Sequence, residues 1–159
     1  MPNICENEVS IYSADANQIR SFMKFVKSKD CYFDFNKIVP SPNWNKTPDE
    51  NGELPTKVKR IRNSEGKLVM TIRSFPTSGK TDDRWYDWNR KNWGTKWNAG
   101  NAEVYVCEYG HHVQFKFQTA WAAPVEILLA LREQYPDLQF NWFYRIEDWE
   151  DCGFLHREV

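Results

Sequence analysis

The chain has 159 residues, 16% of them aromatic, and a formal net charge of −1. This length fits one domain, and the aromatic content excludes a disordered chain, which lacks apolar surface to bury. No run approaches the roughly 20 apolar residues that span a bilayer, and the first residues lack the basic and apolar regions of a signal peptide. We therefore expect a cytoplasmic protein without a membrane segment.

The N-terminal residues predict a strand followed by a helix. Val9 and Ile11 alternate with polar residues over positions 4–12, which is typical of a half-buried strand. Apolar residues then recur with the helical spacing i, i+3, i+4 and i+7, at Ile19, Phe22, Met23 and Val26. We expect this helix to end between residues 28 and 30.

The next segment predicts little regular structure before a hairpin. Residues 31–39 predict a short extended piece, and the four prolines within residues 40–56 indicate a loop. Residues 57–75 predict a hairpin whose turn includes Gly66, because glycine supplies the positive φ that such turns require.

Tryptophan is concentrated in residues 85–97, which hold four of the eight in the chain, interleaved with basic residues. A short helix is expected to begin this segment, with Thr81-Asp82-Asp83 as its cap. The indoles form either a corner of the core or a surface on which a ligand stacks, because a large apolar ring with one N–H suits both. We expect Trp121 to join this cluster.

The second half of the chain predicts three strands and one helix. The helix begins at Pro124, where the missing N–H costs nothing. With the first strand and helix, the order is that of a ferredoxin-like split βαβ sandwich, an α+β fold with a four-stranded antiparallel sheet and two helices on one face. Residues 1–159 then form a single domain, with residues 31–100 as a long insertion that carries the hairpin and the short Trp-rich helix. The three strands are expected over residues 103–108, 112–119 and 138–144.

Charge is distributed unevenly. Residues 57–97 hold eleven basic and four acidic side chains, whereas residues 133–159 hold two basic and seven acidic ones. The two segments give the molecule faces of opposite potential if they lie apart, and internal ion pairs if they pack together. Near the C-terminus, carboxylates around one tryptophan fit either a partner interface with a buried anchor or a solvent-exposed tail. The predicted partner-binding residues are Glu147, Asp148, Trp149, Glu150 and Asp151.

The basic segment supports an alternative, the binding of nucleic acid or a nucleotide. Basic side chains hold phosphates, and exposed indoles stack on bases. Basic residues on a hairpin also commonly protect a strand edge from aggregation. The residues for the nucleic-acid alternative are Arg60, Arg62, Lys67, Arg90, Lys91, Trp93 and Lys96.

The sequence contains no catalytic or metal-binding pattern, so we expect no enzyme, no metal site and no cofactor. His111 and His112 are adjacent on an expected strand and therefore point to opposite faces. Ser78-Gly79-Lys80-Thr81 resembles the end of a phosphate-binding loop, but Ser74 stands where the first glycine is required. The cysteines lack ligand spacing, and they are Cys5, Cys31, Cys107 and Cys152.

Several stretches resemble the YubB-type ferredoxin-like domain family of bacteriophages and conjugative plasmids. The most specific are Asn92-Trp93-Gly94-Thr95-Lys96-Trp97-Asn98 and Thr119-Ala120-Trp121-Ala122-Ala123-Pro124. Others lie at the N-terminus and over residues 33–42, while Ile4 departs from the pattern. The resemblance implies a ferredoxin-like fold and an origin in a mobile element, but no activity.

These observations favour a non-enzymatic accessory protein of a phage or other mobile element. We expect it to bind and modulate a host macromolecular complex, for example as an inhibitor of a bacterial defence system such as CRISPR. Its small size, uneven charge and long insertion support this expectation. The alternative remains a nucleic-acid or nucleotide binder that uses the basic hairpin and the Trp-rich segment.

Overall fold

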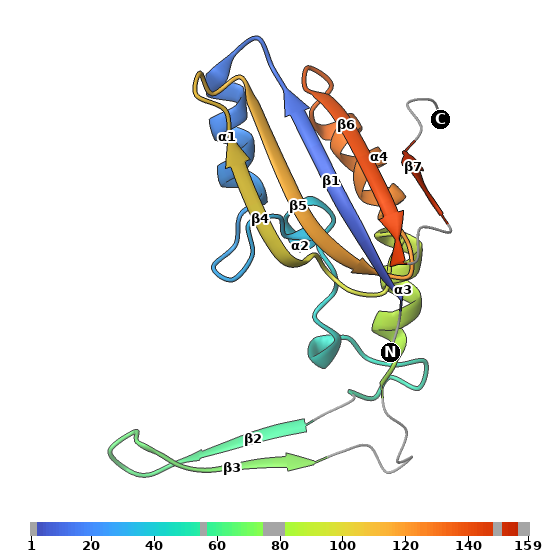
Figure 1. Cartoon of the computed structure of the whole chain (residues 1–159). Coiled ribbons are helices and arrows are strands. Elements are labelled where there is room, and N and C mark those ends of the chain that lie inside the picture. The colour runs from blue at the N-terminus through green and yellow to red at the C-terminus, as the bar shows by residue number, and fades with distance from the viewer. Residues whose placement is uncertain (1–2, 55–56, 75–81, 148–150, 156–159) are drawn as a thin grey trace. The chain divides into compact units, whose positions relative to one another are not determined.

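The computed structural model describes residues 3–54, 57–74, 82–147 and 151–155 (Figure 1). The chain divides into two compact units. The first comprises Met1–Ser41 together with Tyr86–Val159, and the second is Pro42–Trp85.

The first unit is built on a five-stranded antiparallel sheet. Its strands lie in the order β4-β5-β1-β6-β7, and the first four have the order of a ferredoxin-like sandwich. The prediction of four strands was therefore incomplete, because a fifth strand pairs with β6 at the edge. The strands are β1 (Ile4–Tyr12), β4 (Gly100–Val106), β5 (His112–Ala120), β6 (Gln139–Ile146) and β7 (Cys152–Phe154).

Helices α1 (Ala16–Val26) and α4 (Val125–Gln134) cover one face of this sheet (Figure 1). The stripe predicted for α1 is confirmed, since Ile19, Phe22 and Val26 are buried. In α4 the buried residues are Ile127, Leu128 and Leu131, whereas Val125 is exposed. No helix among the described residues is long and apolar enough to cross a membrane.

Residues 31–41 belong to the first unit and supply Phe33, Phe35 and Ile38 to its core, although the sequence placed residues 31–39 in an extended piece of the insertion. Phe33 lies against Phe117 with ring centroids 4.9 Å apart and planes at 16°. Asp34 then caps a short helix, α2 (Phe35–Ile38), by accepting a hydrogen bond from the backbone N–H of Asn36. The alternation of aromatic and polar residues resembled a strand, but the Asp34 cap starts a helical turn instead.

The second unit contains a 3₁₀ turn, η1 (Trp44–Lys46), and an antiparallel ribbon of β2 (Lys57–Arg62) and β3 (Leu68–Ser74). The predicted hairpin is thus confirmed, and Gly66 in its turn has φ +78°. Helix α3 (Arg84–Asn92) follows, and from Tyr86 onward it belongs to the first unit. Asp82 Oδ1 accepts from the backbone N–H of Arg84 at 3.2 Å, while Thr81 lies outside the described residues.

Candidate functional site

The two most specific motifs of the sequence meet in the first unit. The loop after α3 packs against the corner between β5 and α4, where a Cβ on Gly94 would lie 3.1 Å from the backbone nitrogen of Val125. Next to it, the buried Thr95 hydroxyl donates to the Ala120 carbonyl oxygen at 2.9 Å. Gly94 also has φ +80°, so glycine is required there for both space and backbone conformation.

Trp93 lies in the core rather than at a binding surface. It is 4% exposed, and its indole N–H donates to the Val39 carbonyl oxygen at 2.9 Å. Its ring meets those of Phe35 and Trp88 edge to face, each with centroids 5.7 Å apart. A base therefore has no access to the face of Trp93, which the nucleic-acid alternative had included.

Three aromatic residues that neighbour Trp93 in the structure or the motifs gather around one lysine. Lys96 Nζ lies 4.9 Å from the ring centroid of Trp97 and 5.0 Å from that of Trp121. Tyr86 contributes a third ring at 5.6 Å, and the Arg90 guanidinium lies 5.4 Å from that same ring. Trp97 and Trp121 are 45% and 46% exposed. We call these five residues the aromatic–lysine cluster.

The cluster is held in place by its backbone. Trp121 has φ +66°, which is strained for a bulky residue, and its N–H donates to the Asn3 carbonyl oxygen at 2.9 Å. The Lys96 carbonyl oxygen accepts from the buried Asn89 side chain at 2.8 Å. The cations and the half-exposed indoles are thus presented from fixed positions.

The other predicted basic residues are not members of this cluster. Lys91 is exposed on α3, within the first unit. Arg60, Arg62 and Lys67 are exposed on the ribbon of the second unit, where the Arg62 guanidinium donates to the Gly66 carbonyl oxygen at 3.0 Å. The structure thus joins Arg90 and Lys96 in one cluster and assigns the three ribbon residues to another unit.

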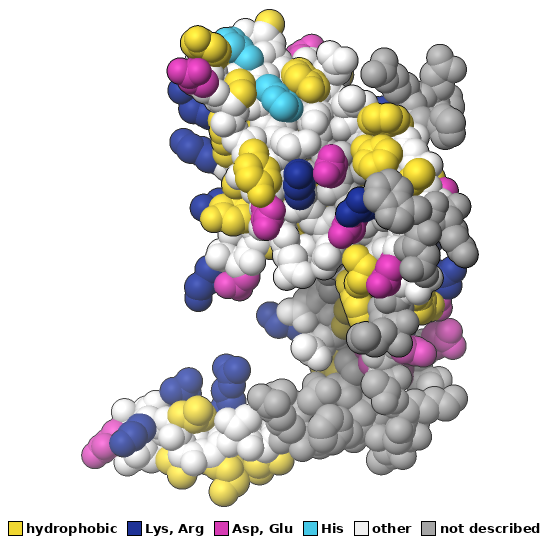
Figure 2. Space-filling view, viewed as in Figure 1, with side chains coloured by type: hydrophobic (Ala, Val, Ile, Leu, Met, Phe, Trp, Pro, Cys, Tyr) yellow, Lys and Arg dark blue, Asp and Glu magenta, His cyan; other side chains and the backbone are white. Residues whose placement is uncertain are grey.

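The ribbon has two different faces. Ile61 pairs with Met70 and Lys59 with Ile72, so Ile61, Met70 and Ile72 share one face, together with Lys59. Arg60 pairs with Thr71 on the opposite face. Figure 2 shows hydrophobic side chains gathered along one side of the ribbon and basic ones on the other. All described side chains of the ribbon are exposed, including Met70 at 53%.

The acidic segment forms the connection between β6 and β7. The Glu147 carboxylate accepts from the backbone N–H of Ile4 at 3.2 Å, and Asp151 accepts from the Tyr144 hydroxyl at 3.1 Å. Glu147 and Asp151 are both exposed. The remaining predicted partner-binding residues, Asp148, Trp149 and Glu150, lie outside the described residues.

The open face of the sheet offers little free charge (Figure 2). Lys116 forms an ion pair with Glu8 at 3.5 Å, and Arg145 pairs with Glu6. Because neighbouring carboxylates neutralise these cations, the face has no obvious attraction for phosphate. His112 stacks on Tyr12 with ring centroids 4.4 Å apart, and the His111 ring lies 3.1 Å from the Ser13 carbonyl oxygen.

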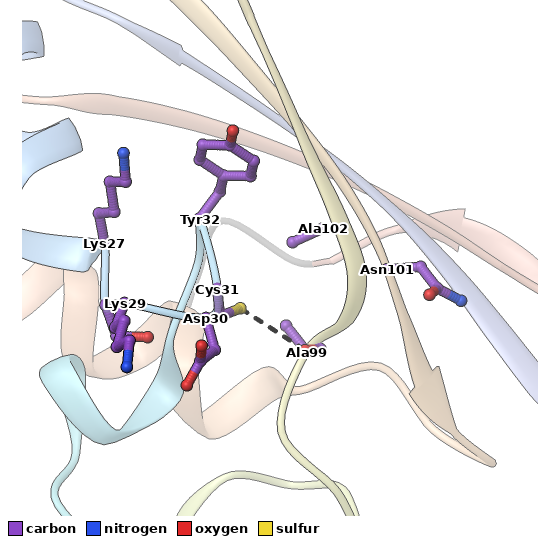
Figure 3. Close-up of a pocket in the computed structure, with 9 residues that line it drawn as sticks. Lys27, Lys29, Asp30, Cys31, Tyr32, Ala99, Asn101 and Ala102 are labelled. Carbon is purple, nitrogen blue, oxygen red and sulfur yellow. Dashed lines mark hydrogen bonds between the residues drawn. The ribbon is translucent and has the colours of Figure 1, made fainter.

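A cavity of about 400 Å³ lies between the segment after α1 and the start of β4 (Figure 3). Lys27 and Tyr32 point to the same side, and Asn101 lies across from them. The Cys31 thiol donates to the Ala99 carbonyl oxygen at 3.6 Å, and burial raises its pKa, so this thiol is a poor nucleophile. Within the described ranges, no group of three or more His, Cys, Asp or Glu side chains is placed to hold a metal ion.

Comparison with known families agrees with the strand order. Residues 92–156 match the family described as "Ferredoxin-like domain in Api92-like protein". The chain therefore carries a ferredoxin-like domain. The match covers part of α3, the strands β4 to β7 and helix α4, and it includes three members of the aromatic–lysine cluster. No curated protein and no solved structure matched the chain.

Sequence reasoning identified Arg90 and Lys96 of this cluster and expected Trp121 nearby, but it overlooked Tyr86. One signal was available, because Tyr86 and Arg90 are four residues apart on a predicted helix and therefore share a face. No such signal showed that Trp97, and not Trp93, is the exposed tryptophan. Each of these tryptophans follows a polar residue in the sequence, and only packing against distant residues makes Trp93 buried and Trp97 exposed.

Proposed function

We propose that this protein is a non-enzymatic accessory protein of a phage or other mobile element, and that it binds a host protein complex through the ribbon of β2 and β3. The observation that carries the proposal is the exposed apolar face formed by Ile61, Met70 and Ile72. Contiguous exposed apolar surface commonly marks a protein interaction site. A two-stranded ribbon is also only marginally stable by itself, so a partner that covers this face would stabilise it.

The charge of the ribbon specifies the chemistry of the partner. Residues 57–74 hold six basic residues and one acidic residue, a net charge of +5. The complementary surface is therefore apolar with an acidic rim. Opposite potentials accelerate the encounter, and the apolar contacts then slow dissociation.

The resemblance to phage and plasmid proteins supports a partner that belongs to the host. Within this proposal the complex is a bacterial defence system such as CRISPR, which the protein inhibits in the cytoplasm. The exposed carboxylates Glu147 and Asp151, with their neighbours Asp148, Trp149 and Glu150, are the candidates for a second contact with a basic surface of the same complex.

The proposal is tested with Met70→Asp, which places a charge in the apolar face. The matched control is Thr71→Asp, an identical charge change on the next residue and the opposite face. In bacteria with an active defence system, the wild-type chain should raise phage yield, Met70→Asp should lose this effect, and Thr71→Asp should keep it. The purified defence complex should bind the two variants with the same ranking. Equal activity of both variants, or no effect of the wild type, contradicts the proposal.

A second candidate function is the binding of duplex DNA by the other face of the ribbon. Arg60 lies on that face beside Thr71, and the major groove admits a two-stranded ribbon. Arg60→Gln should weaken duplex binding and reduce the slope of log K against log salt by about 1. Glu103→Gln, an exposed position on β4 of the first unit, serves as the control. A salt slope that is the same in both variants would exclude this role.

A further inference from the structure

We propose that the aromatic–lysine cluster is a binding site for single-stranded nucleic acid, in which a base stacks on Trp97 or Trp121 and Lys96 contacts the adjacent phosphate. The site lies entirely in the first unit, so it is independent of the ribbon and of the function proposed above. Three properties of the cluster carry this inference, namely two half-exposed indoles, two cations that form no ion pair within the described part of the chain, and a fixed backbone.

The two indoles are exposed although the loops that carry them are tightly packed. Gly94 and Thr95 contact the corner between β5 and α4, and Trp93 fills the core. Trp97 and Trp121, from the same two motifs, keep almost half of their surface open to solvent. Packing thus accounts for Trp93, Gly94 and Thr95 of these motifs. Trp97 and Trp121 remain half exposed and are available to a ligand.

The positive charge of Lys96 and Arg90 favours some of the ligands that stack on tryptophan over others. A cationic ligand would be repelled by the Lys96 ammonium, which already lies near three rings. A neutral sugar could accept hydrogen bonds from Lys96 and Arg90 but would gain no charge–charge attraction from them. Among the described residues no carboxylate forms an ion pair with Lys96. A nucleotide combines a flat ring with a negative charge, and it therefore uses both features of the cluster.

A single strand fits this arrangement better than a duplex. Bases within a duplex are stacked on one another and do not present a free face, whereas those of a single strand do. Stacking on indole tolerates every base, so we expect little sequence preference. The strained backbone of Trp121 supports a ligand-binding role, because such strain persists where the surrounding structure holds a functional side chain in place.

The test measures binding of a fluorescent oligothymidine to the full chain by anisotropy at low salt. We expect saturable binding, about tenfold weaker in Trp97→Leu and in Trp121→Leu. Lys96→Gln should reduce the slope of log K against log salt by the amount expected for the loss of about one phosphate contact. Tyr109→Leu is the matched control, since Tyr109 is an exposed aromatic residue in the turn after β4, and it should bind like the wild type.

Further variants distinguish binding at this cluster from binding at the ribbon, and loss of binding from loss of the folded structure. Trp97→Phe keeps an aromatic face and should retain most of the binding even if Trp97→Leu is unstable. Met70→Asp should leave oligonucleotide binding unchanged, so failure of the proposed partner interaction would not be confused with failure here. The inference is overturned if the oligothymidine does not bind, if a hairpin duplex binds more tightly, or if Arg60→Gln abolishes binding while both tryptophan variants retain it.

Discussion

At the scale of single residues, the core of the first unit includes one polar side chain with a defined role. Asn7 is 1% exposed, and its amide N–H groups donate to the Thr119 hydroxyl at 3.0 Å and to the Cys5 carbonyl oxygen at 3.1 Å. Its carbonyl oxygen accepts from the indole N–H of Trp142 at 3.1 Å. Asn7 thus connects β1 to both of its neighbouring strands and satisfies a buried tryptophan.

We predict that Asn7→Leu lowers the free energy of unfolding by about 1–3 kcal/mol, because the Trp142 N–H loses its buried acceptor while the volume of the side chain is kept. Urea denaturation followed by tryptophan fluorescence measures this change. Asn141→Leu, on β6 but facing the other side of the sheet, is the control and should change stability by less than about 0.5 kcal/mol. Equal effects of the two substitutions would contradict the role given to Asn7.

Burial also predicts how the thiols react. Removal from water raises the pKa of Cys5 to about 11, whereas Cys152 is exposed on the edge strand β7. Because the thiolate is the reactive form, a thiol reagent near neutral pH should label the exposed Cys152 long before Cys5, which should react only after unfolding. Mass spectrometry of digests at successive times follows the order, and labelling in urea provides the reference. Rapid native labelling of Cys5 would show that this part of the sheet opens.

At the scale of elements, a polar network connects α2 to the segment that follows Trp97. The Asp34 carboxylate caps α2 and accepts from the Asn98 side chain at 2.7 Å. Asn98 in turn accepts from the backbone N–H of Phe35 at 2.9 Å. Burial alone would raise the pKa of Asp34, but the hydrogen bonds from Asn98 and Asn36 outweigh it and hold that pKa below its ordinary value.

The pKa of Asp34 predicts a dependence of stability on pH. Because the folded-state pKa is lowered, the stabilisation from this carboxylate is fully present above the unfolded value of about 3.9 and is lost as the pH falls through the folded value. Asp34→Asn should therefore be less stable than the wild type at pH 6, and the difference should shrink toward pH 2. Thermal unfolding across this range measures it. A difference that is independent of pH would indicate that the charge of Asp34 has no part in the effect.

The elements that sequence reasoning identified are those with long periodic patterns. Residues of β1, α1 and β5 repeat with the period of their element over nine or more positions. The two strands were predicted within one residue of their observed ends, whereas α1 ends at Val26, two to four residues before the predicted end. By contrast, α2 has four residues and β7 has three, which is too short for a pattern to exceed chance. Their formation depends on the Asp34 cap and on pairing with β6.

At the scale of the whole molecule, the residues of the hydrophobic core and those of the ribbon belong to different units. The residues of the hydrophobic core cluster all come from the first unit, from Cys5 to Ile38 and from Trp93 to Leu155. In the second unit, by contrast, Ile61, Leu68, Val69, Met70 and Ile72 of the ribbon are exposed. The hydrophobic core of the ferredoxin-like domain therefore contains no described residue of the ribbon.

We predict that replacing residues 43–83 with a short Gly-Ser linker leaves the first unit folded and its unfolding cooperative, since the core cluster is retained. Circular dichroism and a single thermal transition measure this outcome. The shortened chain should lose the partner binding assigned to the ribbon and keep oligonucleotide binding by the aromatic–lysine cluster. A chain that no longer folds would show that the second unit supplies contacts essential to the first.

The sequence by itself determined the ferredoxin-like order of the main strands and helices, the basic hairpin and the concentration of tryptophan, because periodicity, turn residues and composition are local properties of the chain. The tertiary structure alone decided which tryptophans are buried. Trp93 and Trp97 are four residues apart with similar neighbours, but the first meets Phe35 and Val39 while the second faces solvent beside Trp121. The difference arises from contacts with residues distant in the chain, and no local pattern encodes them.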